Sequence, residues 1–180
     1  MALCLACAPL VTPAAAAEKP AAKPEAKAQT AGPRSLGGTK GWNAYSAGDK
    51  KTLVCYLVGR PTKSLPANVA RGSVSLSITD RPGDKSFDVV EFALGYPAKR
   101  GSSAELRIDN KKYPPLFPDN NSAWNTNTAE DRAVTTALAH GHQATIKAVS
   151  DRGTTTTDFY TLDGLNDALA LINKACGVRP

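Results

Sequence analysis

Residues 154–176 read TTTTDFYTLDGLNDALALINKAC, and this closing stretch says most about the fold. Its first half is rich in threonine and ends in aromatic residues, which favour a pleated strand. Asp163 is the predicted N-cap of a following helix. Four residues, spaced by four, three and four positions, fall on one face of that helix: Leu165, Leu169, Ile172 and Cys176. We therefore expect the chain to end as a strand, a tight turn and a helix with a cysteine on its buried face.

Short strand-like segments dominate the preceding part of the chain. The clearest is Ser73–Thr79, where apolar residues alternate with serine and threonine as in a half-buried strand. Residues 51–58 read KTLVCYLV and predict a strand that is buried on both faces. Further strands are predicted at residues 41–45, 87–94, 104–108, 111–116, 143–149 and 154–161, whereas residues 119–128 are expected to be irregular.

This pattern predicts a mainly β fold. Short strands with turn signals about every 8–12 residues are typical of an antiparallel β-sandwich. A short helix from Thr128 or Ala129 to about Ala139 is predicted in addition to the C-terminal one. The alternative is an α+β fold in which helices cover one face of a sheet.

The start of the chain resembles a secretory signal peptide. The short apolar run Leu3–Val11 is followed by the alanine run Ala14–Ala17, as at a signal cleavage site. We therefore assign residues 1–17 to a signal peptide, which is expected to be incomplete at its start because the usual basic residues are absent. The alternative is a lipoprotein signal with lipidation at Cys7.

The next segment differs from the remainder in composition. Residues 18–39 are rich in Ala, Pro and Lys and predict a disordered linker. Residues 40–180 are then long enough for a single domain with one core.

The formal charge is +6, from 22 Lys and Arg against 16 Asp and Glu. The cations are scattered, and no basic stripe or base-stacking motif accompanies them, so we expect no nucleic-acid partner. A bias of this size predicts at most a weak attraction to anionic surfaces. The apolar run near the start is too short to cross a bilayer, which takes about 20 apolar residues, so the protein is not expected to be transmembrane.

Two cysteines belong to the predicted core, Cys55 in the strand at residues 51–58 and Cys176 on the closing helix. A secretory signal sends a protein to an oxidising compartment, where buried cysteines pair. We therefore predict a Cys55–Cys176 disulfide, and the alternative is two buried free thiols. Cys55 and Cys176 are far apart in the sequence and form no Cys-x-x-Cys motif, which argues against a redox role.

Few residues are candidates for chemistry. His140 and His142 straddle the predicted end of a helix, without further metal ligands close in sequence. Glu130 and Asp131 belong in the first turn of a helix, where the helix dipole favours them. Asp158 is expected to face solvent, a cross-strand cation or a groove. We therefore predict no catalytic residues, no cofactor and no metal site.

Short motifs follow one another along the domain: Gly41-Trp42-Asn43, Val54-Cys55-Tyr56, Arg81-Pro82-Gly83, Gly95-Tyr96-Pro97 and TTDFYTLDGL at residues 156–165. In this order they resemble the invasion-associated locus B family, a group of secreted proteins of Gram-negative bacteria. The resemblance implies an immunoglobulin-like β-sandwich in the periplasm or at the cell surface and, for some pathogenic members, a link to host-cell invasion. It brings no catalytic residues. The chain departs from many members, which have further cysteines in mid-domain, where this chain has Trp124.

The sequence thus predicts a non-enzymatic binding protein that is periplasmic or secreted, with lipid anchoring to the outer membrane as the alternative location. Its partner is expected to be an envelope or host protein. Binding is expected through the loops at residues 59–68, 95–103 and 119–128. The alternative functions are a structural or chaperone-like protein that pairs an edge strand with its partner and an unrecognised hydrolase.

Overall fold

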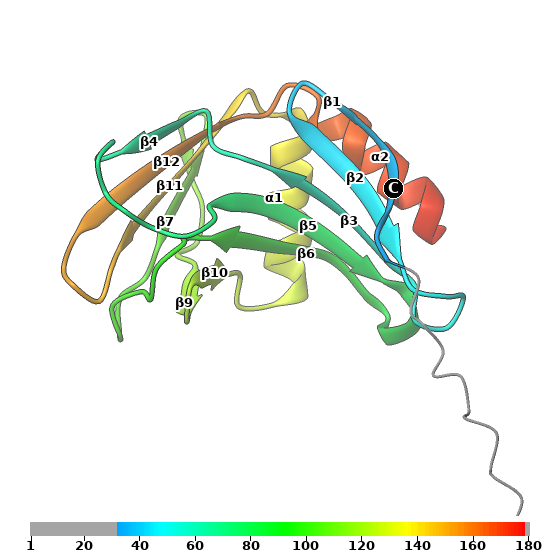
Figure 1. The fold of residues 1–180 in the computed structure, drawn as a ribbon, viewed down its shortest axis with the longest axis horizontal. Helices are drawn as coiled ribbons and strands as arrows, with labels where there is room; N and C mark the ends of the chain where they lie inside the picture. Colours follow the sequence, from blue (N-terminus) through cyan, green and yellow to red (C-terminus); the bar gives the residue numbers. More distant parts are fainter. Residues whose placement is uncertain (1–31, 179–180) are drawn as a thin grey trace, which may run out of the picture.

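A computed structural model describes residues 32–178 and shows a mainly β fold of two antiparallel sheets and two helices (Figure 1). Sheet A has the strand order β1 (Arg34–Thr39), β2 (Trp42–Ala47), β3 (Val54–Gly59), β5 (Ser75–Arg81), β6 (Ser86–Ala93), β10 (Ser122–Trp124) and β9 (Phe117–Asp119). Sheet B has the order β4 (Lys63–Leu65), β12 (Thr155–Thr161), β11 (Gln143–Val149), β7 (Glu105–Ile108) and β8 (Lys111–Lys112). The helices are α1 (Thr128–His140) and α2 (Leu165–Cys176), and a 3-10 turn, η1 (Pro82–Asp84), joins β5 to β6. The predicted antiparallel β-sandwich with a C-terminal helix is confirmed.

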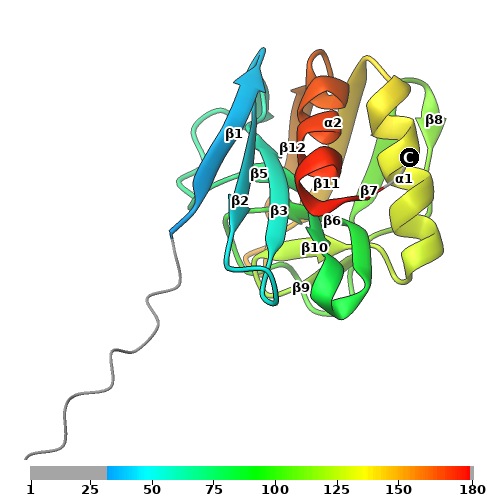
Figure 2. The same ribbon diagram turned by 90° about the vertical axis from the view of Figure 1, so that its right-hand side faces the viewer.

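Sheet B and the two helices share one face of sheet A. Helix α2 packs on β1, β2, β3 and β5, whereas α1 packs on β6, and Figures 1 and 2 show the helices side by side next to sheet B. Phe92 of β6 and Tyr160 of β12 meet edge to face, with ring centroids 6.2 Å apart. One core therefore joins both sheets, and its fully buried members include Leu57, Ile78, Val90, Ile146 and Ile172.

Strand β3 is buried on one face only. Cys55 and Leu57 point into the core, whereas Val54 and Tyr56 remain partly exposed. The prediction that residues 51–58 form a strand buried on both faces is wrong. Sheet B and both helices pack on the face of sheet A that carries Cys55 and Leu57, and the other face, with Val54 and Tyr56, is left partly exposed. On the outer side, Tyr56 stacks on Tyr45 of β2 with ring centroids 5.3 Å apart.

Helix α1 forms where the sequence predicts it. The Asn127 side chain accepts a hydrogen bond from the Glu130 backbone N–H at 2.9 Å, and Glu130 Oε2 accepts one from the Thr126 N–H at 3.0 Å. These reciprocal bonds satisfy N–H groups at the start of the helix. Asp131 does more than interact with the helix dipole, because its Oδ1 accepts a hydrogen bond from the Val90 N–H at 3.1 Å and so fastens α1 to β6.

Helix α2 is also confirmed, but the prediction that Asp163 is its N-cap is wrong. The N-cap is Gly164, which has a φ of 86° and provides no side chain to cap the helix. A Cβ at this glycine would lie 2.8 Å from the Thr39 carbonyl oxygen, so the tight turn requires glycine there. Asp163 instead forms an exposed ion pair with Lys40, at 3.3 Å.

The domain begins earlier than predicted. Residues 18–39 were expected to form a disordered linker, but Arg34–Thr39 form β1 and pair with β2. The prediction is therefore wrong for this part of the segment. The reason is tertiary: Leu36 packs against the core, and Leu171 of α2 approaches Gly37. The predicted signal peptide, residues 1–17, lies outside the described residues.

Residues 117–124 form a hairpin rather than an irregular segment. Strand β10 pairs with β9 on one side and with β6 on the other, so it extends sheet A. Asn120 turns the hairpin with a φ of 49°, a backbone conformation that asparagine adopts more readily than most residues. The predicted strand at residues 111–116 is reduced to the two residues of β8.

Candidate functional site

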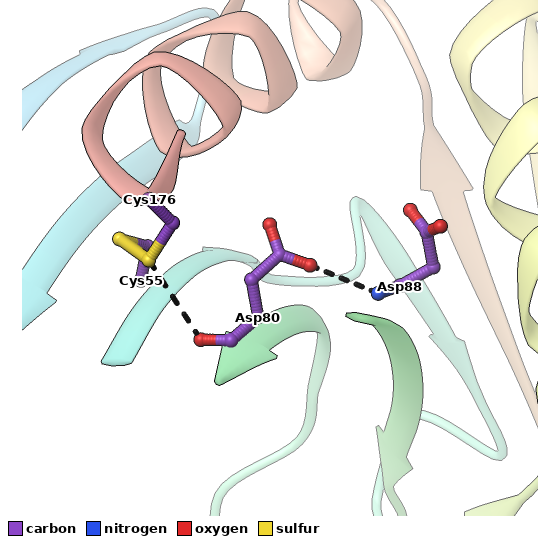
Figure 3. The surroundings of a disulfide bond; sticks show 4 residues. All are labelled: Cys55, Asp80, Asp88 and Cys176. Carbon is purple, nitrogen blue, oxygen red and sulfur yellow. Dashed lines mark hydrogen bonds between the residues drawn. A yellow bond between two sulfur atoms is a disulfide. The ribbon is translucent and has the colours of Figure 1, made fainter. Parts of the chain in front are cut away.

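A disulfide joins β3 to the last turn of α2. The Cα atoms of Cys55 and Cys176 lie 6.0 Å apart, and their sulfur atoms are bonded at 2.03 Å. The predicted pairing is confirmed, and the alternative of two free thiols is wrong. In Figure 3 the disulfide lies beside Asp80, whose carbonyl oxygen is 3.9 Å from the Cys176 sulfur. The candidate for lipidation, Cys7, lies outside the described residues.

A groove of about 1080 Å³ runs between α1 and α2. Figure 2 shows the two helices antiparallel, and Gly141 at the end of α1 lies against Leu162, which precedes α2. Cavities that hold small molecules usually have volumes of about 300–1,000 Å³, so the groove is large enough for a ligand. Its apolar lining comes from both helices, the β5–β6 connection and the residues after α2: Pro82, Phe87, Ala139, Leu169, Ala170 and Val178.

The charged residues of this inter-helix groove are unevenly placed. Arg132 near the start of α1 and Lys174 near the end of α2 belong to the same end of the groove, because the helices are antiparallel. His140 and Asn166 belong to the opposite end. Asp88 is the acidic residue of the lining, and its Oδ2 lies 3.7 Å from Arg132 Nε. The groove therefore has one cationic end, at which one of the two cations already has an acidic neighbour.

A buried carboxylate lies close to this cationic end. Asp80 on β5 is fully buried, and its Oδ1 accepts a hydrogen bond from the Asp88 N–H at 2.9 Å. Its other oxygen has no hydrogen-bond partner among the described residues. Figure 3 shows both side chains on the same side of the β5–β6 connection. Burial raises the pKa of both Asp80 and Asp88, and for Asp88 the nearby Arg132 opposes that rise.

Sequence reasoning missed Asp80 because it lies in the turn sequence Asp-Arg-Pro-Gly-Asp. The strand pattern nevertheless indicates that Asp80 is buried. The alternation that turns Leu76 and Ile78 inward continues without interruption to Asp80. Extending the predicted strand by one residue would have placed this carboxylate in the core.

Asp158 is buried in an ion pair with Arg71. The two guanidinium Nη atoms donate to its two oxygens, Nη1 to Oδ2 at 3.0 Å and Nη2 to Oδ1, and Ser64 Oγ donates to Oδ1 at 2.6 Å. The side chains are only 8% and 1% exposed. The expectation that Asp158 faces solvent is wrong. A cation does face it, but from the loop after β4 rather than from a neighbouring strand.

The two histidines are not brought together at one site. His140 Nδ1 lies 2.8 Å from the Thr136 carbonyl oxygen, within α1. His142 Nδ1 lies 3.8 Å from Asp109 Oδ2, beyond the end of that helix. Residues 32–178 contain no group of three or more His, Cys, Asp or Glu side chains that could hold a metal ion.

The three loops predicted to bind a partner do not form one site. Those at residues 95–103 and 119–128 meet, because the Ala98 N–H donates to the Asn120 carbonyl at 2.9 Å. The loop at residues 59–68 contains β4 and lies at an edge of sheet B. A smaller cavity of about 420 Å³ lies between Tyr96 and the turn that joins β11 to β12.

The helices of the described chain are too short and too polar to span a membrane. The family model described as "Invasion associated locus B (IalB) protein" matches residues 42–173. No curated protein and no solved structure matches the chain. The matched range contains α1, most of α2 and Cys55, and it stops three residues short of Cys176. The chain therefore belongs to the invasion-associated locus B family.

Proposed function

We propose that this chain is a non-enzymatic binding protein of the periplasm or cell envelope and that it holds its ligand in the inter-helix groove. The observation that carries the proposal is the groove itself, with apolar walls and two cations at one end. Family membership supports an invasion-associated locus B type of protein. The Cys55–Cys176 disulfide fits an extracytoplasmic location.

The carboxylates with lowered pKa values give no reason to propose a catalytic role, because each one has a local structural partner. The pKa of Asp109 is lowered by hydrogen bonds from the Gln143 and His142 backbone N–H groups. The pKa of Glu130 is lowered by its hydrogen bonds to Thr126, at the start of α1. These groups hold a turn and a helix cap in place, and we assign them no part in a reaction.

The test is a binding experiment with a groove-filling variant. Ala170 lines the groove and is exposed on α2, so Ala170→Trp places a large ring in the groove with little change to the core. Ala133→Trp is the matched control, because Ala133 is exposed on α1 but does not line the groove. Immobilised parent and variants are exposed to a detergent extract of envelope, and the bound lipids and proteins are identified by mass spectrometry. We expect Ala170→Trp to lose a component that the parent and Ala133→Trp both retain; equal retention by all three would contradict groove binding.

A second candidate function uses an edge of sheet A. Within residues 32–178, β1 pairs with β2 and has no strand on its other side. An open strand edge can add a strand from another protein. A proline at Ser35 would disrupt this edge strand and leave the groove residues unchanged. Loss of a protein partner from Ser35→Pro, but not from Ala170→Trp, would favour this edge over the groove.

The family's name connects it with invasion, and we extend that role to this chain as a proposal. In a bacterium that enters host cells, deletion of the gene should reduce entry, and the parent gene should restore it. Complementation with Ala133→Trp should also restore entry, whereas Ala170→Trp should not. Normal entry of the deletion strain would remove invasion from the proposed function.

A further inference from the structure

The inter-helix groove follows the length of the two helices that line it. Its walls are helices of 13 and 12 residues that touch each other, so at 1.5 Å per residue it extends for about 20 Å. A third helix is about 10–12 Å wide with its side chains. Such a helix could lie only across the top of the groove, whereas an unbranched extended chain could enter it.

The middle of the groove is mainly apolar. Thr135 and Thr136 line it, but their hydroxyl groups already donate to backbone carbonyls, to Asp88 O at 3.3 Å and to Arg132 O at 2.9 Å. The remaining wall is formed mostly by small or apolar side chains, notably Ala139, Leu169 and Ala170. It also contains Asn173, whose buried Oδ1 has no hydrogen-bond partner among the described residues. An occupant of this part therefore gains stability mainly by removing apolar surface from water.

One cation of the groove lining is without an acidic partner. Arg132 lies 3.7 Å from Asp88, but Lys174 forms no ion pair among the described residues. A negative charge on the occupant would pair with Lys174. The opposite end, with His140 and Asn166, has no acidic side chain in its lining.

We propose that the inter-helix groove binds a free fatty acid, an inference that rests on the proposed function of the groove as the ligand site. Its carboxylate lies between Lys174 and Arg132, and its acyl chain runs along Leu169 and Ala170 toward His140. The apolar walls, the contact between the two helices and the unpaired Lys174 together favour one unbranched chain with one negative head.

The first test measures displacement of a fluorescent probe, 11-(dansylamino)undecanoic acid, from the full chain. Octanoate, decanoate and dodecanoate are compared as competitors. Full burial of a methylene is worth about 0.8 kcal/mol, which is about fourfold in affinity. In an open groove we expect about two- to fourfold tighter binding per methylene, so dodecanoate should bind more than tenfold tighter than octanoate.

Charge and shape are tested with matched variants. Lys174→Gln should weaken dodecanoate about two- to fivefold, the worth of one exposed ion pair, and should leave dodecanol unaffected. Lys147→Gln is the control, because Lys147 is exposed on β11 and lies outside the groove. Ala170→Trp should abolish probe binding, whereas Ala133→Trp should not; circular dichroism confirms that each variant is folded.

Two results would overturn this proposal. The first is dodecanoate binding that Ala170→Trp leaves unchanged. The second is no binding of the probe or of dodecanoate at all. If an acidic helical peptide binds in a way that Ala170→Trp prevents, the groove remains the binding site and only the fatty acid is wrong. If Ala170→Trp also retains every envelope component that the parent binds, the proposed function fails as well.

Discussion

Reduction of the Cys55–Cys176 disulfide should remove a large part of the stability of the domain. The bond closes a loop with a sequence separation of 121 residues. Chain-entropy theory assigns such a loop about 5 kcal/mol, because the link restricts the unfolded chain. Typical domains are stable by about 5–15 kcal/mol in total. We therefore expect the reduced protein to be close to its folding threshold.

Urea unfolding with and without reductant measures this effect. For an m-value of about 2 kcal/mol/M, a loss of about 5 kcal/mol lowers the unfolding midpoint by about 2.5 M. Thiol counting must show two free thiols in the reduced sample. The double variant Cys55→Ala/Cys176→Ala is the control, since its midpoint should be low and should not respond to reductant.

The loss should also be uneven along the chain. The disulfide holds the last turn of α2 on β3. The earlier turns of the helix are held by the core packing of Leu165 and Ile172, which are fully buried. Amide hydrogen exchange should therefore accelerate first near the C-terminal end of α2. A midpoint that falls by less than about 0.5 M, with both thiols free, would refute the loop-entropy reasoning.

Three further substitutions test other contacts. Arg71→Met leaves the Asp158 carboxylate buried without its cation, so it should cost about 3–5 kcal/mol in urea unfolding; a cost below about 1 kcal/mol would contradict this. Burial raises the pKa of Asp80, so its contribution to stability is present in acid and is lost as the pH rises through the raised pKa. Asp80→Asn should therefore become increasingly stable relative to the parent as the pH rises above the ordinary aspartate pKa of about 3.9, and a constant difference between pH 4 and pH 8 would contradict that cause. Asn127→Ala removes the acceptor for the Glu130 N–H at the start of α1 and should cost about 1 kcal/mol, measured as a lower thermal midpoint; an unchanged midpoint would show that the cap contributes nothing.

Local patterns were sufficient to predict the closing strand and helix. The spacing of Leu165, Leu169, Ile172 and Cys176 fixes one helical face whatever surrounds it. The disulfide followed from placing both cysteines in the core of a protein predicted to be exported. The N-cap could not be predicted in this way, because the left-handed turn at Gly164 is set by its contact with Thr39, far away in the sequence.

Contacts between distant segments account for the other differences. The alternation of β12 puts Asp158 on the same face as Tyr160, but nothing near Asp158 in the sequence indicates that Arg71 will cover it. Strand β1 is rich in glycine and exposed, and it exists because β2 offers it an edge. The inter-helix groove had no sequence signal at all, since its walls come from two helices separated by a hairpin of sheet B.

The position of α2 also fixes when the domain can finish folding. This last helix covers the inner face of β1, β2 and β3, the first strands to be synthesised. The Trp42 Nε1–H bond to the Thr161 carbonyl joins residues 119 positions apart. Contacts between such distant segments form late and slowly. A nascent or truncated chain that lacks α2 therefore leaves the inner face of its first hairpins uncovered, and protease resistance should appear only after synthesis has passed residue 176.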